Sequence, residues 1–370
     1  MSLLPFADPR ASLEPARAEL VEAFEAVLDS GRYILGAQVE SFEREWAERC
    51  GTAHAVGVSS GTDALALALR SAGVGPGDEV LVPAMTAVAT WMAVSQIGAV
   101  PVGVDIEPLR NGMDPELAQA ALSPRTRALV AVHLFGQPAD VAALGDVAAL
   151  AGVPLIEDAA QAHGARLDGR EAGSLGALAA FSFYPTKNLG AIGDAGAVTT
   201  SDPELADRVR VLREYGWRTR LDAELKGVNA RLDELQAALL RVMLSRLQAA
   251  IARRRSIADR YLEGLAGIES LELPAAISGS EPSWHLFVVR HARRDALAAG
   301  LARSGVGTGV HYATLPPLNS AFRADGFRAG DFPAAERHAA SALSLPMHPG
   351  LSEVDVERVI EQVRGVAGRL

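Results

Sequence analysis

The sequence predicts an α/β protein with a mostly parallel sheet and helices on both of its faces. Three observations predict this fold. β-rich apolar runs alternate with Ala- and Leu-rich helical runs from about residue 50 to residue 200, as successive β-α-β units do. The 370 residues exceed one comfortable core, so two domains are expected. A helical pattern over residues 232–262 has no Gly or Pro and would bridge them.

The individual elements follow from the same alternation. Apolar runs predict a seven-stranded sheet in the large domain, with strands at 54–59, 79–83, 101–105, 127–134, 153–157, 179–183 and 196–200. Helical patterns predict helices at 62–72, 87–97, 114–122, 140–151 and 203–214. We assign residues 1–250 to this large domain. Residues 251–370 form a smaller α+β domain with a strand at 284–290, helices at 294–304 and 352–369, and an irregular stretch at 311–333.

Composition argues against several classes of function. The net charge of −10 disfavours nucleic acid or an anionic membrane as the main partner. Residues 80–104 carry no charge, but Pro83, Gly98 and Pro101 interrupt them, so no membrane span is predicted. The single Cys50 rules out an internal disulfide, and the histidines show no metal-ligand spacing. The chain opens without a cationic and apolar leader, so the cytoplasm is the expected location.

Lys187 is the most informative residue. It follows the predicted strand 179–183 and precedes a glycine-rich stretch, so its ammonium does not easily reach bulk water. Burial lowers the pKa of a lysine, and a neutral amine attacks a carbonyl to form a Schiff base. The alternative is an ordinary surface lysine on a loop.

Two further segments suit such a lysine. Asp158 ends an apolar strand, where an aspartate can pair with a protonated pyridine nitrogen; the alternative is a carboxylate that caps a helix. The turn from Ser59 to Thr62 precedes a helix, and the free amides and dipole of a helix start bind phosphate. Each signal is weak alone, but the three in this order form a specific set.

On these residues the chain resembles the DegT/DnrJ/EryC1/StrS group of pyridoxal-phosphate-dependent sugar aminotransferases, over essentially its whole length. Other stretches that carry the resemblance are 35–43, 89–95, 133–140 and 226–238. Within the group it looks most like the enzymes that aminate C3 of nucleotide-linked 3-keto-6-deoxyhexoses. The resemblance implies the fold-type I aminotransferase architecture, a homodimer with shared active sites, and an N-terminal helix near 14–29 packed beside the small domain.

The resemblance also implies a role for each site residue. Lys187 is implied as the catalytic residue, which bonds the cofactor and then moves a proton between the substrate and the cofactor. The implied cofactor-binding residues are Ser60, Gly61, Thr62, Trp91, Asp158, Gln161, Ser182 and Asn229. Asn229 would reach the phosphate of the neighbouring subunit, or would otherwise be a turn residue. The implied sugar contacts are Tyr184, His311 and Tyr312, residue types that also pack cores routinely.

Three positions depart from the family pattern. Relatives carry an aromatic residue after Thr86 that stacks on the cofactor ring, but this chain has Ala87. Trp91, one helical turn further on, or His163 is expected to cover the ring instead, and the alternative for His163 is an ordinary core histidine. Thr62 is more typical of other branches than of the C3 enzymes, and residues 313–317 replace a more regular pattern at the sugar side.

The sequence therefore predicts transfer of an amino group from L-glutamate to a dTDP-linked 3-keto-6-deoxyhexose, in deoxysugar or antibiotic biosynthesis. Amination at C4 of a 4-keto nucleotide sugar, or of a keto-cyclitol, stays open. A non-catalytic protein that binds the cofactor as a sensor is a more remote alternative. The lyase branch of the family replaces the lysine, so Lys187 excludes that branch.

Overall fold

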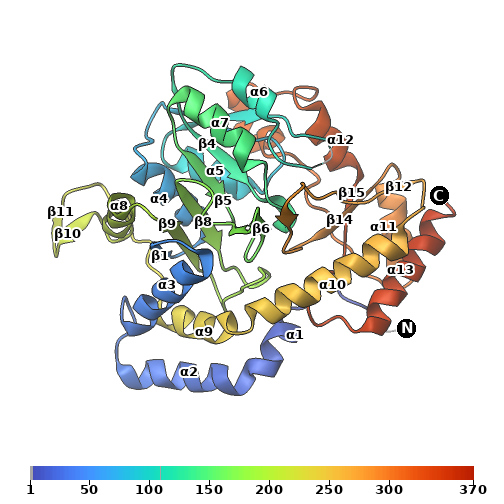
Figure 1. Cartoon of the computed structure of the whole chain (residues 1–370), viewed down its shortest axis with the longest axis horizontal. Coiled ribbons are helices and arrows are strands. Elements are labelled where there is room, and N and C mark those ends of the chain that lie inside the picture. Colours follow the sequence, from blue (N-terminus) through green and yellow to red (C-terminus); the bar gives the residue numbers. More distant parts are fainter. Residues whose placement is uncertain (1–2, 109) are drawn as a thin grey trace.

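The computed structural model describes residues 3–108 and 110–370 and is built on one large sheet (Figure 1). Its seven strands lie in the order β1-β9-β8-β5-β4-β2-β3. They are β1 (His54–Val58), β2 (Glu79–Pro83), β3 (Val100–Val104), β4 (Thr126–Val132), β5 (Leu155–Asp158), β8 (Leu178–Ser182) and β9 (Gly196–Thr200). Neighbours from β8 to β3 are parallel, whereas β9 is antiparallel to β8 and to β1. The predicted mostly parallel sheet is confirmed.

Helices cover both faces of this sheet because alternate strand residues point to opposite sides. The covering helices are α3 (Ala37–Cys50), α4 (Gly61–Ser71), α5 (Val88–Gln96), α6 (Pro115–Ala120), α7 (Val141–Ala151) and α8 (Pro203–Arg213). Val80 and Val82 share a core with α4, α5 and α8, whereas Leu81, between them, shares one with α6 and α7. All parallel strands thus end at one edge, which the loops before the helices surround.

The predicted continuous helix over 232–262 is wrong. The segment forms α9 (Glu234–Leu244) and α10 (Leu247–Leu265), which meet at a bend of 58°. α9 packs on α2 (Arg17–Ser30) and α3, whereas α10 packs on α13 (Glu353–Ala367), so different partners fix the two directions. The Ser245 hydroxyl closes the end of α9 by donating to the Val242 carbonyl at 2.8 Å.

The N-terminal helix also differs from expectation. α2 packs on α9, where Leu20 and Leu239 share a small core, and not beside the C-terminal part. The residues before α2 make that connection instead, since Leu4 pairs with Val306 and joins the C-terminal core. Two short helices, α1 (Arg10–Leu13) and η1 (Glu14–Ala16), lead from this point back to α2.

The C-terminal part has a hydrophobic core of its own, formed by α10, α11 (Arg294–Arg303), α13 and an antiparallel sheet. The sheet order is β12-β14-β15, with β12 (Leu271–Glu272), β14 (Phe287–His291) and β15 (Ala342–Leu345). β15 was not predicted, because four residues directly after α12 (Pro333–Ser341) give too short a β pattern. The irregular stretch contains two 3₁₀ turns, η3 (Pro316–Leu318) and η4 (Ser320–Asp325).

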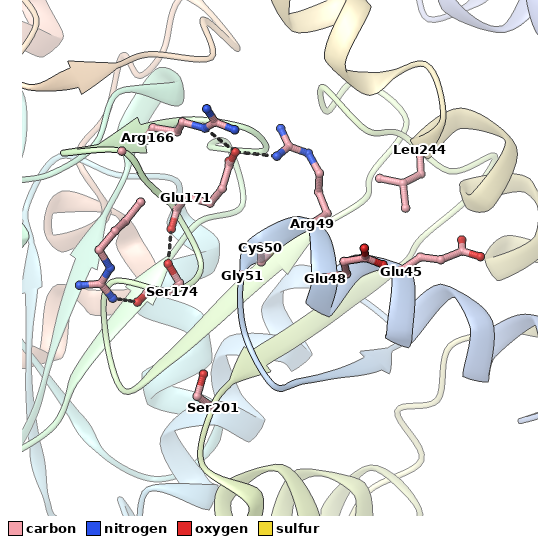
Figure 2. Close-up of a pocket in the computed structure, with 12 residues that line it drawn as sticks. Glu45, Glu48, Arg49, Cys50, Gly51, Arg166, Glu171, Ser174, Ser201 and Leu244 are labelled. Carbon is pink, nitrogen blue, oxygen red and sulfur yellow. Dashed lines mark hydrogen bonds and ion pairs between the residues drawn. The ribbon is translucent and has the colours of Figure 1, made fainter.

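Two small β structures complete the described chain. The hairpin of β10 (Trp217–Thr219) and β11 (Asp222–Ala223) projects beyond α8 (Figure 1). β13 (Ser280–Glu281), β6 (Arg166–Leu167) and β7 (Arg170–Glu171) form a sheet whose β7 faces α3 across a hollow of about 720 Å³ (Figure 2). Within the described residues no single helix is long and apolar enough to cross a membrane; only the bent pair α9 and α10 meets those criteria jointly.

Candidate active site

A cavity of about 240 Å³ lies at the edge where the parallel strands end. It is lined by most of the predicted site, namely Ser60, Gly61, Thr62, Asp158, Gln161, Ser182, Tyr184 and Lys187. Thr86, His133 and Asp194 also line it, and sequence reasoning assigned them no role. The parallel sheet gathers residues far apart in the chain, because its carboxyl ends meet at one edge.

Lys187 reaches this cavity from the loop after β8. Its amide donates to the Tyr184 carbonyl at 2.8 Å, which closes a turn in this loop. Burial lowers the pKa of Lys187 to about 8, and the charge of Asp158 opposes the shift. Part of the Lys187 amine is therefore unprotonated near pH 7, and the unprotonated amine is the form that attacks a carbonyl.

Asp158 is held by a relay of hydroxyl groups. Thr90 donates from Oγ1 to the Oδ2 atom of Asp158 at 2.7 Å, and the Ala160 amide donates to Oδ1 at 3.2 Å. Thr90 Oγ1 lies 2.8 Å from Thr86 Oγ1. Because the Thr90 proton is already directed at the carboxylate, Thr86 must be the donor of that pair. The relay fixes the carboxylate in one orientation, and its sequence signal was a pair of threonines four residues apart in an apolar segment.

The start of α4 forms the other end of the cavity. Ser60 caps the helix, accepting from the Asp63 amide at 3.1 Å, and its hydroxyl donates to the Asp63 carboxylate at 2.8 Å. The amides of Gly61 and Thr62 belong to the first turn, where a helix offers them no carbonyl partner. A Cβ atom on Gly61 would lie 2.5 Å from the Cβ of Ser182, so only glycine lets α4 begin against β8.

Gln161 connects the cavity to the C-terminal part of the chain. Its Oε1 accepts from the Phe135 amide at 2.7 Å, in the turn η2 (Leu134–Gly136), and its Nε2 donates to the Tyr312 hydroxyl at 3.0 Å. Burial raises the pKa of Tyr312 to about 12, so its hydroxyl stays protonated. One donor position on Nε2 remains for a ligand.

His133 and Glu157 support the cavity wall from beneath. Both side chains are fully buried, and His133 Nε2 lies 2.9 Å from the Glu157 carboxylate. His133 Nδ1 accepts from the Ala139 amide at 2.9 Å, so Nε2 carries the proton and donates. Glu157 also accepts from the amides of Gly173, Leu175 and Gly176, each at 2.7 Å. These bonds tie the loop before β8 to the strand that carries Asp158.

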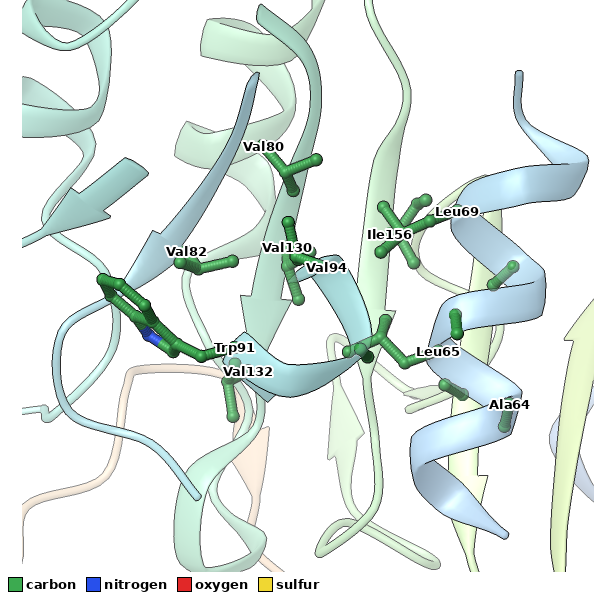
Figure 3. Close-up of a cluster of buried hydrophobic side chains, with 14 of the residues drawn as sticks. Ala64, Leu65, Leu69, Val80, Val82, Trp91, Val94, Val130, Val132 and Ile156 are labelled. Atoms are coloured by element: carbon green, nitrogen blue, oxygen red, sulfur yellow. The ribbon is translucent and has the colours of Figure 1, made fainter. Parts of the chain in front are cut away.

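The expectation that Trp91 or His163 covers a cofactor ring is corrected by their positions. Trp91 is fully buried, donates from Nε1 to the Pro83 carbonyl at 3.0 Å, and lies in the core between α5 and the sheet (Figure 3). His163 is also fully buried, among the rings of Trp46, Phe181 and Phe183. Ala87, just before α5 begins, does line the cavity, whereas Trp91 is not among its lining residues.

The remaining predicted residues lie outside this cavity. Asn229 is exposed in the segment after β11, paired with Glu214 across a bridge. His311 lines a neighbouring cavity, with its Nδ1 2.8 Å from the Ser344 hydroxyl, and burial lowers its pKa to about 4. Among the residues that the structure describes, no group of His, Cys, Asp and Glu side chains is arranged to hold a metal.

The chemistry of the cavity fits pyridoxal phosphate. The Gly61 cradle and the first-turn amides suit a phosphate, an oriented Asp158 suits a ring nitrogen, and Lys187 offers an amine of lowered pKa between them. Ser182 and Thr62 add hydroxyl groups beside the amides. Position 87 contributes only the methyl group of an alanine, so no aromatic ring can stack on the cofactor from there.

Comparisons with known proteins agree with this chemistry. The sequence pattern of the DegT/DnrJ/EryC1/StrS aminotransferase family matches residues 15–364. A dTDP-3-amino-3,4,6-trideoxy-alpha-D-glucose transaminase from Streptomyces venezuelae is 50% identical over 367 residues, covering 99% of this chain and 97% of its own. A dTDP-3-amino-3,6-dideoxy-alpha-D-galactopyranose transaminase from Aneurinibacillus thermoaerophilus is 43% identical over 361 residues, with 98% and 99% covered. The structure of Streptomyces venezuelae DesV in complex with a ketimine intermediate has a TM-score of 0.98, with 50% identity and both chains fully covered.

Proposed function

Because the chain belongs to the DegT/DnrJ/EryC1/StrS aminotransferase family and is a pyridoxal-phosphate-dependent sugar transaminase, we propose a specific reaction for it. It transfers an amino group from L-glutamate to the 3-keto carbon of a dTDP-linked 6-deoxyhexose. The observation that carries the proposal is the meeting of Lys187, Asp158 and the α4 start in one cavity. Two relatives with different dTDP-3-amino sugars in their names support position C3 and the nucleotide, and leave the sugar itself open.

The cofactor supplies an aldehyde that takes up the amino group and a ring that withdraws electrons when its nitrogen is protonated. The chain's own residues do the rest. Asp158, oriented by Thr90, would keep that nitrogen protonated. The amides of Gly61 and Thr62 would hold the phosphate end, and the free Nε2 position of Gln161 would donate to the ring hydroxyl. Lys187 would move the proton between substrate and cofactor, since a pKa of about 8 lets it act as acid and as base near neutral pH.

The sugar side of the site is proposed to be formed by Tyr184, His311 and Tyr312. Tyr184 stands at the open mouth of the cavity, and the Tyr312 hydroxyl reaches its wall through Gln161. His311 precedes Tyr312 and lines the adjoining cavity. Protonated hydroxyls and neutral imidazoles suit the hydroxyl groups of a sugar.

The active enzyme is proposed to be a homodimer. Asn229 is exposed and lies outside the cavity of its own chain, so it is free to reach the phosphate end of a second copy. Apolar side chains beside Asn229 and on the loop that carries Lys187 are uncovered, with Val228 40% exposed and Tyr184 and Ile192 each 51% exposed. A second copy would remove these side chains from water.

Mixing inactive subunits tests this arrangement. Lys187→Ala and Asn229→Ala subunits are combined and allowed to exchange. If Asn229 acts in trans, each heterodimer has one intact site, and random exchange restores about a quarter of wild-type activity. No recovery after exchange has been verified would show that Asn229 serves its own subunit or only forms a turn.

The reaction itself is tested with a panel of substrates. The purified enzyme is incubated with L-glutamate and 3-keto or 4-keto nucleotide sugars, and the products are identified by mass spectrometry and NMR. We expect amination of 3-keto dTDP sugars. Turnover of 4-keto sugars or keto-cyclitols alone would overturn the C3 assignment, and cofactor binding without any turnover would favour a sensor.

A further inference from the structure

Lys187 separates the cofactor cavity from a second cavity of about 240 Å³. The second cavity lies between the N-terminal segment, the loop after β8 and the C-terminal part of the chain. Its wall includes Asp8, Ser12, Arg254, His285 and His348 in addition to Lys187. Phe6 closes it on one side and stacks on His311, with ring centroids 5.5 Å apart.

Arg254 is the unusual group in this wall, as its neighbours on α10 make clear. Arg253 forms an ion pair with Glu353, and Arg255 forms one with Glu281. Arg254 lies between them, is 5% exposed, and makes no ion pair with any carboxylate among the described residues. A buried cation without a counter-charge is expensive, so a ligand that supplies one is favoured there.

The donors of Arg254 are only partly used. Nη1 donates to the carbonyls of Trp284, His285 and Met347 at 3.1, 3.2 and 2.8 Å, while Nε is buried without a hydrogen-bond partner in the described part of the chain. The carbonyls fix the guanidinium and leave other donor positions toward the cavity that Arg254 lines. A guanidinium fork of this kind matches a carboxylate.

The histidines around Arg254 add hydrogen-bonding groups without adding charge. Burial lowers the pKa of both His285 and His348, and Arg254 lowers each further, so both rings are neutral. His285 Nδ1 and both nitrogens of His348 are buried and unpaired among the described residues. Asp8 does not compensate Arg254, because Arg10 already binds both of its oxygens at 3.0 Å. With Lys187 bonded to the cofactor and Asp8 paired with Arg10, Arg254 is the unpaired charge that this wall offers, beside several neutral polar groups.

We infer that the second cavity binds a carboxylate of the amino donor, with Arg254 as its cationic anchor. A single positive charge matches one carboxylate, whereas a nucleotide diphosphate carries more charge than this wall compensates. Lys187 lines both cavities, so a donor held by Arg254 would present its amine at the boundary with the cofactor cavity. The inference rests on the proposed function, because it concerns the donor of that reaction.

The test uses glutarate, a dicarboxylate without an amino group, as a probe that binds without reacting. Removing Arg254 would also break three carbonyl contacts, so the charge is instead neutralised from across the cavity with Ser12→Asp. Ser12→Asn is the matched control. Calorimetry on the holoenzyme should give a glutarate Kd at least tenfold higher for Ser12→Asp than for Ser12→Asn. The KM for glutamate should follow, and the KM for the keto sugar should not.

Two results would overturn the inference. One is equal glutarate affinity in the Asp and Asn variants. The other is a selective loss of dTDP binding in Ser12→Asp, which would assign the cavity to the nucleotide. Failure of the proposed function looks different: no keto sugar would be aminated, yet glutarate binding would still depend on the charge at position 12.

Discussion

Two polar regions of this protein differ in how their charged side chains are paired. Between α3 and β7, Glu171 accepts from Arg49 and from Arg166, each at 2.6 Å, so these three charged side chains have partners within the chain (Figure 2). In the cavities that meet at Lys187, Arg254 has no carboxylate partner among the described residues and the lysine has a lowered pKa. This difference in charge pairing favours the cavities at Lys187 over the larger hollow as ligand sites.

Removing one charged group from each region should have very different effects. Lys187→Ala should lower turnover at least about 1000-fold, because Lys187 carries the one side-chain amine among the described residues that line the cavity. Glu171→Gln should leave kcat within about twofold and instead lower the free energy of unfolding by about 1–3 kcal/mol. Steady-state kinetics and denaturant unfolding measure the two effects. A borohydride-reduced cofactor adduct on any lysine other than Lys187 would contradict the assignment.

The pH dependence of cofactor attachment tests the lowered pKa directly. Only the neutral amine attacks, so the rate at which cofactor-free protein combines with pyridoxal phosphate should rise about tenfold per pH unit and level off near pH 8. An ordinary lysine would level off near 10.5. Asp158→Asn removes the charge that favours the ammonium, so the midpoint should move lower. Stopped-flow absorbance gives both midpoints, and a wild-type midpoint near 10.5 would refute the burial argument.

The smallest expected effect on the site comes from two adjacent residues of α5. Thr90→Val removes a hydrogen bond to a carboxylate and should weaken cofactor binding about tenfold, while Thr90→Ser restores it. Trp91→Ala should lower the free energy of unfolding by about 3–5 kcal/mol, yet change cofactor affinity of the folded protein less than twofold. Fluorescence titration and chemical unfolding separate these outcomes. A large affinity loss in Trp91→Ala alone would return that ring to the site.

The strands of the large sheet and the helices α4 to α8 were predictable because their signals are local, whereas α3 was not predicted. Each strand is a short apolar run between turn residues, and the start of α4 carries a serine cap that can be read from the sequence. The bend at Ser245 was not predictable, because no Gly or Pro marks it and it arises from packing against two different sets of helices.

The site residues also divide into those that the sequence could predict and those that it could not. Lys187, Asp158 and Gly61 follow strands or precede a helix, so their positions at the sheet edge follow from topology. Trp91 was misplaced because periodicity gives the spacing of α5 residues but not which side of the helix faces the cavity. The unpaired state of Arg254 could not be predicted for another reason. The sequence does not distinguish three consecutive arginines, and only the fold shows that Arg253 and Arg255 have acidic partners.

The contact between Gly61 and Ser182 has a consequence for anyone who wishes to re-engineer this enzyme. A methyl group at position 61 would lie 2.5 Å from the Ser182 Cβ, so every substitution there must push α4 away from β8. The start of α4, proposed to hold the phosphate, would then move away from the strand that leads to Lys187. Substitutions at position 61 therefore cannot adjust cofactor affinity alone, because any change there alters the spacing of the whole site. Thr62, whose side chain lines the cavity without this contact, is where affinity can be adjusted in steps.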